Sequence, residues 1–455
     1  MRAFARQMTE RMKAVAAGGA VAAFWLAVWV FAAALVAQPL ILPGPGIVAV
    51  ALLRLVCDAG TWAILVGSGA RILGGLALAV ACGGVLAGVS VRSRTFARLV
   101  APALSFVKAT PVACIVVLLL IWLGSARVSI VAVFLMALPG VYFSLVEGLT
   151  QADKPLKQMF RLHCVRGWRL FCAHTWREVL PFVLSCARAV IGMSWKAGVA
   201  AELIGMAVGT VGERIYQAKL LIETADLLAW TVLVVMASWA CERVLVWLLR
   251  ASGPAAWRAA VLSHGRGLRG RAGAADVAEL ALAVGDRAPW APALDGLVLN
   301  VPAGGRICVM GTSGVGKSTL LALAAGECAP CSMVFQDVRL VEGASALDNV
   351  LVCADARVDA SSAAALLRLL VPGVDVHARV AELSGGQRRR VEIARALLCP
   401  GGAVILDEPF TGLDTAARDA CAEVVLDLLV GRMLLLATHD AVDAQALNIS
   451  DIITL

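Results

Sequence analysis

A glycine-rich turn between a short apolar run and a helical run could hold a phosphate group. Residues 306–310 have the pattern of a buried strand, and residues 320–325 that of a helix. Glycines between them let successive backbone N–H groups and the helix N-terminus face an anion. A coincidental glycine-rich turn would not need to lie between a strand and a helix. Lys317 would reach the β- and γ-phosphates, and Ser318 would offer its hydroxyl to Mg²⁺. The candidate nucleotide-binding residues are Gly311, Thr312, Ser313, Gly314, Val315, Gly316, Lys317, Ser318 and Thr319.

Two adjacent carboxylates follow a second strand-like run at residues 403–406. Asp407 stands where a carboxylate can hold the water shell of Mg²⁺. Glu408 is the next carboxylate, placed to polarise an attacking water molecule. The pattern therefore predicts that this strand ends at a site of nucleotide hydrolysis.

A second small-residue turn opens the helical run at residues 388–398. It contains Ser384, Gly385, Gly386 and Gln387, and it offers another helix N-terminus with exposed amides. Two phosphate-binding turns in one chain are unusual for a simple kinase or GTPase.

Six motifs in this order resemble the ATP-binding cassette (ABC) family. The resemblance covers about 130 residues and implies an α/β P-loop NTPase with a RecA-like core and a helical subdomain, using ATP and Mg²⁺. The motifs are the Walker A turn at residues 311–319, the Q-loop Gln336, the signature at residues 383–387, the Walker B strand at residues 406–409, the D-loop at residues 412–414 and the switch histidine His439.

The resemblance also implies roles for single residues. Glu408, His439 and Gln336 would be catalytic, and Ser318, Gln336 and Asp407 would hold the metal. Cassettes of this family act as head-to-tail dimers, so ATP would lie between Lys317 of one copy and Ser384 and Gly386 of the other. The remaining nucleotide contacts that the resemblance implies are Gly385, Gln387, Asp414 and the adenine-stacking Trp290.

The cassette departs from the family pattern in two places. Only 19 positions separate Lys317 from Gln336, so the β-hairpin that cassettes usually carry between these two residues is missing. Cys328 and Cys331 lie in the short connection that takes its place. These thiols could be a redox pair or half a metal site, but a short turn with incidental cysteines is favoured because no second pair lies in this domain. The usual adenine-stacking position is occupied by Ala288, which leaves two alternatives: Trp290 after a small insertion, or no stacking aromatic at all.

The composition indicates that much of the chain lies in a membrane. Of its 455 residues 60% are hydrophobic and only 16% are charged. Residues 1–250 carry 23 basic and 10 acidic side chains (+13), residues 251–275 carry 4 and none (+4), and residues 276–455 carry 13 and 22 (−9). The basic excess thus belongs to the apolar part, which argues against a nucleic-acid partner.

Six apolar runs are long enough to cross a bilayer. Fifteen basic residues lie in the segments predicted to be cytoplasmic and four in the outer segments. The first run is longer than the apolar region of a signal peptide, so a retained helix is preferred. An even number of spans leaves residue 251 onward in the cytoplasm, where ATP is. The predicted spans are residues 14–37, 64–89, 99–123, 128–147, 180–205 and 227–249.

The membrane part resembles the permeases of nitrate, sulfonate and taurine importers, which implies an all-α, six-helix domain of the type I importer kind. The resemblance rests on the six spans and on a segment with Pro181, Arg188, Gly192, Trp195 and Glu202 after a cytoplasmic loop. The basic loop at residues 148–178 could rest on anionic lipid. The resemblance instead implies that residues 153–178 are a coupling helix seated near the Q-loop.

Three domain segments follow: a permease at residues 1–250, a basic Gly/Ala linker at residues 251–275 and the cassette at residues 276–455. Within the fifth span, Arg188, Lys196 and Glu202 could line a polar path or form a gate. The competing interpretation is that they snorkel and that Lys196 neutralises Glu202.

The sequence therefore predicts a fused permease and ABC-type ATPase that takes up a small solute from an extracytoplasmic binding protein. It would act as a homodimer, or paired with a second permease and cassette chain, in the bacterial cytoplasmic membrane, with its N-terminus and ATPase domain in the cytoplasm. Two alternatives stay open: an ABC exporter, or a membrane-anchored cassette protein that does not transport. Neither the solute nor the binding protein can be read from these residues.

Overall fold

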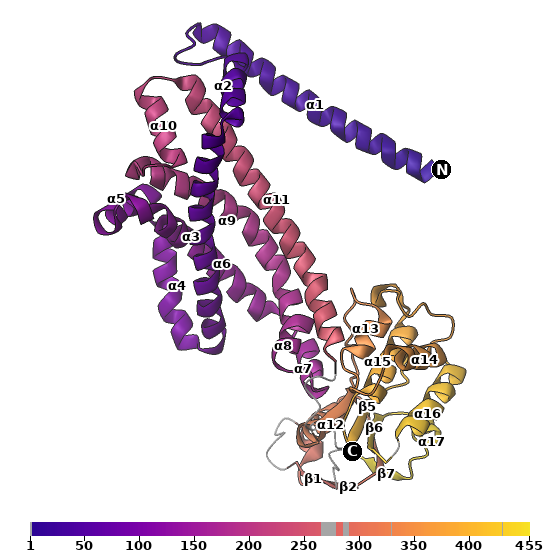
Figure 1. Ribbon diagram of the computed structural model, residues 1–455. Coiled ribbons are helices and arrows are strands. Elements are labelled where there is room, and N and C mark those ends of the chain that lie inside the picture. Colours follow the sequence, from indigo (N-terminus) through magenta and orange to yellow (C-terminus); the bar gives the residue numbers. More distant parts are fainter. Residues whose placement is uncertain (1, 265–278, 285–290, 329, 430) are drawn as a thin grey trace. The chain divides into compact units, whose positions relative to one another are not determined.

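The structure is a computed structural model that describes residues 2–264, 279–284, 291–328, 330–429 and 431–455 (Figure 1). Its contacts form two compact units. The membrane unit comprises residues 1–151 and 179–251, and the cassette unit comprises residues 152–178 and 252–455. This division differs from the predicted domain boundaries, because most of the loop at residues 148–178 groups with the cassette.

The membrane unit is helical throughout. Five helices of the described residues are long and apolar enough to cross a membrane, and α4 with α5 forms a sixth candidate that is bent by 102°. Two of the five, α9 and α11, continue into the residues of the cassette unit. The helices are α1 (Arg2–Val36), α2 (Pro45–Cys57), α3 (Ala59–Arg92), α4 (Arg94–Ala109), α5 (Val112–Leu123), α6 (Ser125–Gln151), α9 (Trp176–Gly205), α10 (Val211–Leu220) and α11 (Thr224–Leu262).

Two expected features differ in the structure. The third predicted span, residues 99–123, is broken between α4 and α5 at Thr110 and Pro111, because proline disfavours a helical conformation of the residue before it. The predicted linker is partly helical, since α11 runs on to Leu262. The rest of the linker, from residue 265 onward, lies outside the described residues.

Helices α3 and α6 pack closely because α3 carries glycines on the contact face. A Cβ atom on Gly75 would lie 2.4 Å from the carbonyl oxygen of Ile130. A Cβ atom on Gly83 would lie 2.9 Å from Cγ1 of Val141. Any larger residue at these positions would push the two helices apart.

The cassette is built on a five-stranded parallel sheet with the strand order β4-β5-β6-β3-β7. A separate two-stranded antiparallel sheet pairs β1 (Glu279–Ala283) with β2 (Val298–Pro302). Strands β5 and β6 are buried on both faces, as expected for the centre of a parallel sheet. The five parallel strands are β3 (Arg306–Met310), β4 (Cys331–Val334), β5 (Ala403–Asp407), β6 (Met433–Thr438) and β7 (Asp451–Thr454).

Short and medium helices complete the cassette unit. The hydrophobic core includes Met159 and Phe160 from the loop between α6 and α9, and Trp257 from the end of α11, together with the strands of the sheet. The loop is therefore part of the same packed body as the cassette. The helices are α7 (Lys154–Leu162), α8 (Gly167–Leu170), η1 (Phe171–Thr175), η3 (Pro292–Leu294), α12 (Lys317–Glu327), α13 (Ala346–Leu351), α14 (Ala360–Leu370), η4 (Val380–Glu382), α15 (Gly385–Leu398), α16 (Thr415–Leu429) and α17 (Ala441–Ala446).

Candidate functional site

Four motif residues lie at one edge of the parallel sheet. Gly311 follows β3, Gln336 lies two residues after β4, Asp407 ends β5 and His439 follows β6. Because parallel strands end at the same edge, the topology brings together residues that are up to 128 positions apart in the chain. This edge is where open α/β sheets bind ligands.

The glycine-rich turn forms a pocket of about 290 Å³ at this edge. Gly314 and Gly316 have φ angles of +84° and +115°, which residues with a side chain rarely adopt. They let the turn curl above the first residues of α12, whose N–H groups have no partner within the helix. The pocket is lined by Ser313, Gly314, Gly316, Lys317, Ser318, Thr319, Gln336 and Glu408.

Lys317 is held over the turn. Its Nζ donates hydrogen bonds to the carbonyl oxygens of Gly311 at 2.7 Å and Thr312 at 3.0 Å, and its side chain is buried. An ammonium group that is satisfied only by neutral carbonyls would be attracted strongly to an incoming phosphate.

Asp407 and Ser318 are polar residues that lie next to each other at the pocket. Burial raises the pKa of the Asp407 carboxyl above its usual value, while a hydrogen bond with Ser318 acts in the opposite direction. A desolvated carboxylate next to a hydroxyl is a donor set that suits Mg²⁺, since oxygen ligands are what this ion prefers. Gln336, the third predicted metal ligand, lines the same pocket.

Glu408 is fixed at the pocket by its backbone and by a histidine. It has a positive φ of +45°, and its N–H donates to the carbonyl oxygen of Ala437 at 2.8 Å. Its Oε1 lies 3.2 Å from Nδ1 of His439, and Thr411 donates its hydroxyl to Oε2 at 3.3 Å. The strained backbone and these two contacts aim the carboxylate at one place, which is the arrangement that a general base needs.

The signature turn is a helix cap in this chain. Ser384 accepts a hydrogen bond from the N–H of Gln387 at 3.3 Å, and Gln387 Oε1 accepts from the N–H of Ser384 at 2.9 Å. Gly386 packs against the loop before α16: a Cβ atom at this position would lie 3.3 Å from the carbonyl oxygen of Gly412. Asp414 accepts from the N–H of Ala417 at 2.8 Å at the start of α16. The residues that line the pocket include neither residues 384–387 nor Asp414.

Trp290 and Ala288 lie outside the described residues. Cys328 and Cys331, in the short connection between Lys317 and Gln336, are buried and form no disulfide. Burial raises the pKa of the Cys328 thiol to about 11 and that of Cys331 to about 12. Both are therefore poor nucleophiles at neutral pH, which favours incidental thiols over a redox pair.

Arg389 is a residue that the sequence reasoning missed. This buried side chain of α15 donates to the carbonyl oxygens of Phe335 and Gln336 on one side, the latter at 3.1 Å. On the other side it donates to the carbonyl oxygens of Asp407 at 3.2 Å and Glu408 at 2.9 Å. One guanidinium thus ties the signature helix to both the Q-loop and the Walker B strand. The only signal in the sequence was the run of three arginines at residues 388–390.

A fully buried carboxylate supports this guanidinium. Glu392 lies 2.9 Å from Arg389 and 3.3 Å from Arg395, and it also accepts from the N–H of Arg339 at 2.6 Å. Arg395 donates to the carbonyl oxygen of Arg339 at 2.6 Å. Arg339 stacks on the ring of Phe335, 3.6 Å from its centre. The cluster therefore orders the backbone on both sides of Gln336.

The loop between α6 and α9 contacts the same region. Strand β4 is at the edge of the sheet, and the N–H of Met333 on its open side donates to Nε2 of His163 at 3.1 Å. Arg339 donates to the carbonyl oxygen of Pro155 at 3.4 Å, and Arg169 donates to that of Val352 at 2.8 Å. These bonds place residues 152–178 beside β4 and beside residues 339 and 352, which follow Gln336 in the chain.

His163 accepts its hydrogen bond as a neutral ring. Burial lowers its pKa well below the usual value, and the charge of Arg395 lowers it further. Nδ1 lies 3.1 Å from the sulfur of Met159, so the Nδ1–H tautomer leaves Nε2 free to accept.

In the membrane unit, Glu202 is buried and paired, but not with Lys196. Its carboxylate accepts from the Ser68 hydroxyl at 2.8 Å and from Nε of Arg71 at 3.2 Å. The predicted neutralisation of Glu202 by Lys196 is therefore wrong. Six residues of one helix separate the two side chains by about 120° around its axis, so they lie on different faces.

Two family models match this chain. Residues 79–258 match the model described as binding-protein-dependent transport system inner membrane component, and residues 329–411 match the model described as ABC transporter. An aliphatic sulfonates import ATP-binding protein, SsuB, of Escherichia coli (strain K12) is 36% identical over 179 residues, which cover 34% of this chain and 68% of the relative. The chain belongs to the ABC transporter family.

Other relatives are similar over the same share of the chain. The aliphatic sulfonates import protein SsuB 1 of Rhizobium johnstonii is 35% identical over 35% of this chain and 66% of the relative. The taurine import protein TauB of Chromobacterium violaceum is 38% identical over 34% of this chain and 68% of the relative. This ABC transporter thus spans about two thirds of the length of these curated relatives.

A solved structure described as the dimeric structure of a bacterial ABC transporter cassette is 24% identical. It covers 36% of this chain and 86% of that chain, with a TM-score of 0.33. The predicted architecture, a helical membrane part followed by an α/β cassette, is confirmed by the family matches and the fold. The cassette is an ABC-type ATPase domain.

Proposed function

We propose that this chain takes up a small solute across the bacterial cytoplasmic membrane at the expense of ATP. The observation that carries the proposal is the joining, in one chain, of a permease part matched by an importer family and a cassette whose pocket is lined by Lys317, Ser318, Gln336 and Glu408. The importer match favours uptake over export. The bonds that join residues 152–178 to Met333 in β4 and to Arg339, on either side of Gln336, favour transport over a merely anchored ATPase.

The ATP site would work as follows. Lys317 and the N–H groups at the start of α12 hold the phosphates, and Glu408 accepts a proton from the attacking water while His439 fixes the carboxylate. Mg²⁺, held by Ser318, Gln336 and Asp407, would neutralise charge on the phosphate oxygens. Arg389 keeps Gln336 and Glu408 in register as a positioning residue.

A second cassette would complete the site. The signature turn at residues 384–387 does not line the pocket of its own chain, so its helix N-terminus is available to a nucleotide held by another copy. We infer a head-to-tail pair of cassettes, either from two copies of this chain or with a second cassette chain. Trp290 stays a proposed adenine contact.

The solute would reach the permease from an extracytoplasmic binding protein. The relatives are named for the import of aliphatic sulfonates and taurine, so we infer small organic sulfonates as the first solutes to test. The positive-inside bias supports a cytoplasmic N-terminus and a cytoplasmic cassette.

ATP hydrolysis by the full chain in lipid vesicles tests the catalytic assignment. We expect Glu408→Gln to lower steady-state hydrolysis by about a hundredfold or more while ATP remains bound, because the base is lost and the phosphate contacts are kept. Asp419→Asn, an exposed change on α16, is the matched control. Turnover in Glu408→Gln at the wild-type rate would reject Glu408 as the base and this ATPase mechanism with it.

A further inference from the structure

A threonine hydroxyl is buried at the end of strand β6 in the cassette. The strand is otherwise apolar, and its last residue, Thr438, is fully buried. A buried hydroxyl is costly unless it is hydrogen-bonded. Its Oγ1 donates to Oδ2 of Asp443 in α17 at 2.7 Å and accepts from the N–H of Asp440 at 3.1 Å. The hydroxyl therefore joins the strand to two points of the segment that follows it.

These two bonds enclose His439. The hydroxyl belongs to the residue before the histidine, and both of its partners come after the histidine in the chain. Asp440 closes the turn further: its Oδ1 accepts from the N–H of Val442 at 2.9 Å, and its carbonyl oxygen accepts from the N–H of Asp443 at 3.2 Å. The backbone that carries His439 is thus fixed on both sides.

His439 depends on this turn because packing does little to hold its ring. The side chain is 64% exposed, and its Nδ1 lies 3.2 Å from Oε1 of Glu408. The residue before Thr438 in the strand, Ala437, accepts a hydrogen bond from the N–H of Glu408 at 2.8 Å. The end of β6 therefore sets the positions of both members of the pair that His439 forms with Glu408.

Asp443 and Thr438 stabilise each other. Asp443 is buried, and burial raises the pKa of its carboxyl above the usual value. The hydrogen bond from Thr438 acts in the opposite direction, because it favours the charged carboxylate. Loss of either side chain would leave the other buried without this contact.

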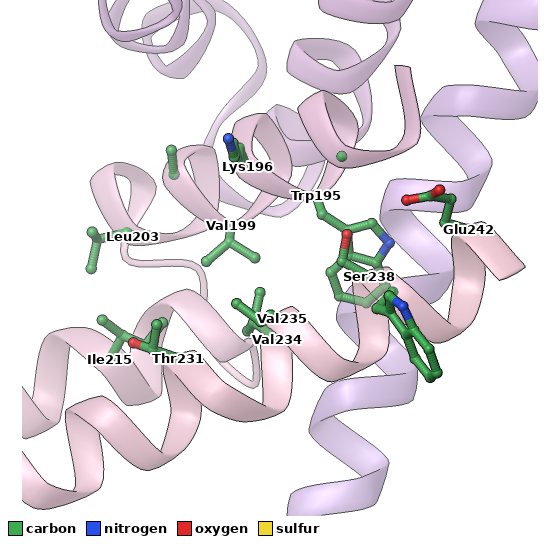
Figure 2. Close-up of a pocket in the computed structure, with 13 residues that line it drawn as sticks. Trp195, Lys196, Val199, Leu203, Ile215, Thr231, Val234, Val235, Ser238 and Glu242 are labelled. Atoms are coloured by element: carbon green, nitrogen blue, oxygen red, sulfur yellow. The ribbon is translucent and has the colours of Figure 1, made fainter. Parts of the chain in front are cut away.

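A hydroxyl of the membrane unit shows what a purely local bond looks like. Thr231 of α11 lies at a groove between α9 and α11 (Figure 2). Its hydroxyl donates to the carbonyl oxygen of Leu227, one turn earlier in the same helix, at 2.8 Å. Such a bond satisfies the hydroxyl within its own helix and joins no second segment. The Thr438 hydroxyl instead joins the end of a strand to a helix across the histidine.

We propose that Thr438 and Asp443 are positioning residues that hold His439 against Glu408 during ATP hydrolysis. Among the described residues that line the nucleotide pocket neither of the two appears, so they act through the histidine. Their loss lowers turnover and leaves the binding of ATP by Lys317 and the glycine-rich turn intact. The inference rests on the proposed function and adds two residues that do not touch the nucleotide.

Steady-state ATP hydrolysis by the full chain in lipid vesicles tests the proposal. Thr438→Val keeps the shape of the side chain and removes the hydroxyl. We expect kcat to fall about tenfold and KM for ATP to stay within about twofold of the wild type. Thr438→Ser keeps the hydroxyl and should restore kcat. Thr454→Val is the matched control, because Thr454 lies opposite Met310 on the other side of the sheet row and is exposed.

A double variant separates positioning from stability. Thr438→Val alone leaves the Asp443 carboxylate buried without its donor, so it also destabilises the end of β6 and α17. Thr438→Val combined with Asp443→Leu replaces both partners by apolar groups, which can be nearly neutral for stability. Hydrogen–deuterium exchange of peptides from β6 and α17 in the full chain measures that stability. We expect the double variant to regain wild-type protection while its kcat stays about tenfold low.

Three outcomes would overturn the proposal. One is a wild-type kcat in Thr438→Val. Another is a kcat that recovers together with protection in the double variant, which would make the bond merely structural. The third is a further loss of about tenfold when Thr438→Val is added to His439→Ala, because the hydroxyl would then act without the histidine. This third measurement decides the matter if the double variant stays unprotected.

The proposed function is judged separately. The threonine variants are compared with the wild type alone, whereas turnover in Glu408→Gln at the wild-type rate rejects the ATPase mechanism whatever the threonine variants do.

Discussion

The membrane unit and the cassette unit each contain a fully buried glutamate, and the two are paired differently. Glu392 in the cassette lies between two arginines that are themselves at most 4% exposed. Glu202 in the membrane unit faces one arginine, Arg71, whose side chain is 28% exposed. Glu202 also accepts from the Ser68 hydroxyl, whose oxygen in turn accepts from the N–H of Val211.

The difference concerns which backbone segments each glutamate orders. The arginines paired with Glu392 donate to the carbonyl oxygens of Gln336, Arg339 and Glu408, so the cluster holds the backbone around the proposed catalytic residues in place. Glu202 joins α3, α9 and the start of α10, so it holds one end of the helical bundle together.

The largest expected effect is the loss of Glu392. Glu392→Leu would leave two buried arginines without a counter-charge, and we expect it to destabilise the region around α15 by about 3–5 kcal/mol. Hydrogen–deuterium exchange of peptides from α15 and from the Q-loop in the full chain measures this. Arg368→Gln, an exposed arginine of α14, is the control. Protection in α15 equal to that of the control would show that the cluster is not needed for order.

The loss of the Glu202 charge should cost less. Glu202→Gln can still accept from Ser68 and Gly212, and Arg71 is partly exposed and also donates to the carbonyl oxygen of Gly209. We expect a loss of about 2 kcal/mol, the usual value of a hydrogen bond to a charged group. Exchange in peptides from α10 measures it. A larger loss here than in Glu392→Leu would reverse the comparison between the two units.

An effect close in size to that of Glu202→Gln is expected from pH on the docking of residues 152–178. Burial lowers the pKa of His163 well below 6.5 and that of His174 to about 4 in the docked segment. The undocked histidines therefore bind protons first, so docking keeps its full stability above about pH 6.5 and loses it as pH falls below that value. One proton accounts for about 1.4 kcal/mol per pH unit.

Exchange of peptides from residues 152–178, compared between pH 7.5 and pH 5.5, measures this loss. His163→Gln keeps an acceptor for the N–H of Met333 but does not titrate, so the pH dependence should become shallower. His163→Gln combined with His174→Gln should flatten it further. A pH dependence that is identical in the wild type and in the double variant would assign the effect to other groups.

Much of the ATP site could be read from the sequence, because its chemistry depends on residues that are close in the chain. The turn around Lys317 and the strand end at Asp407 and Glu408 are local patterns, and the structure brings both to one sheet edge. Arg389 could not be found in this way. It contacts residues that are 54 positions before it and 19 positions after it in the chain, and a run of arginines on a helix is usually a solvent-exposed face.

The membrane unit shows the same limit. The apolar runs predicted the helices well, because a span must be apolar over its length, but they did not predict the break at Thr110 and Pro111 within the third span. The apolar runs could not predict which charged side chains pair within the bundle, since Lys196 and Arg71 are both basic residues in apolar runs. Only the packing of α3 against α9 decides which of the two meets Glu202.

By itself the sequence determined the class of the protein and the order of its two parts, and it predicted the residues proposed to hold phosphate, since these follow from composition and local spacing. Only the tertiary structure decided that residues 152–178 belong to the cassette body, that Arg389 joins two motifs and that Glu202 pairs with Arg71 rather than with Lys196. The reason is physical: burial and pairing are properties of contacts between distant segments. The role of a charged side chain therefore depends on the group that it contacts.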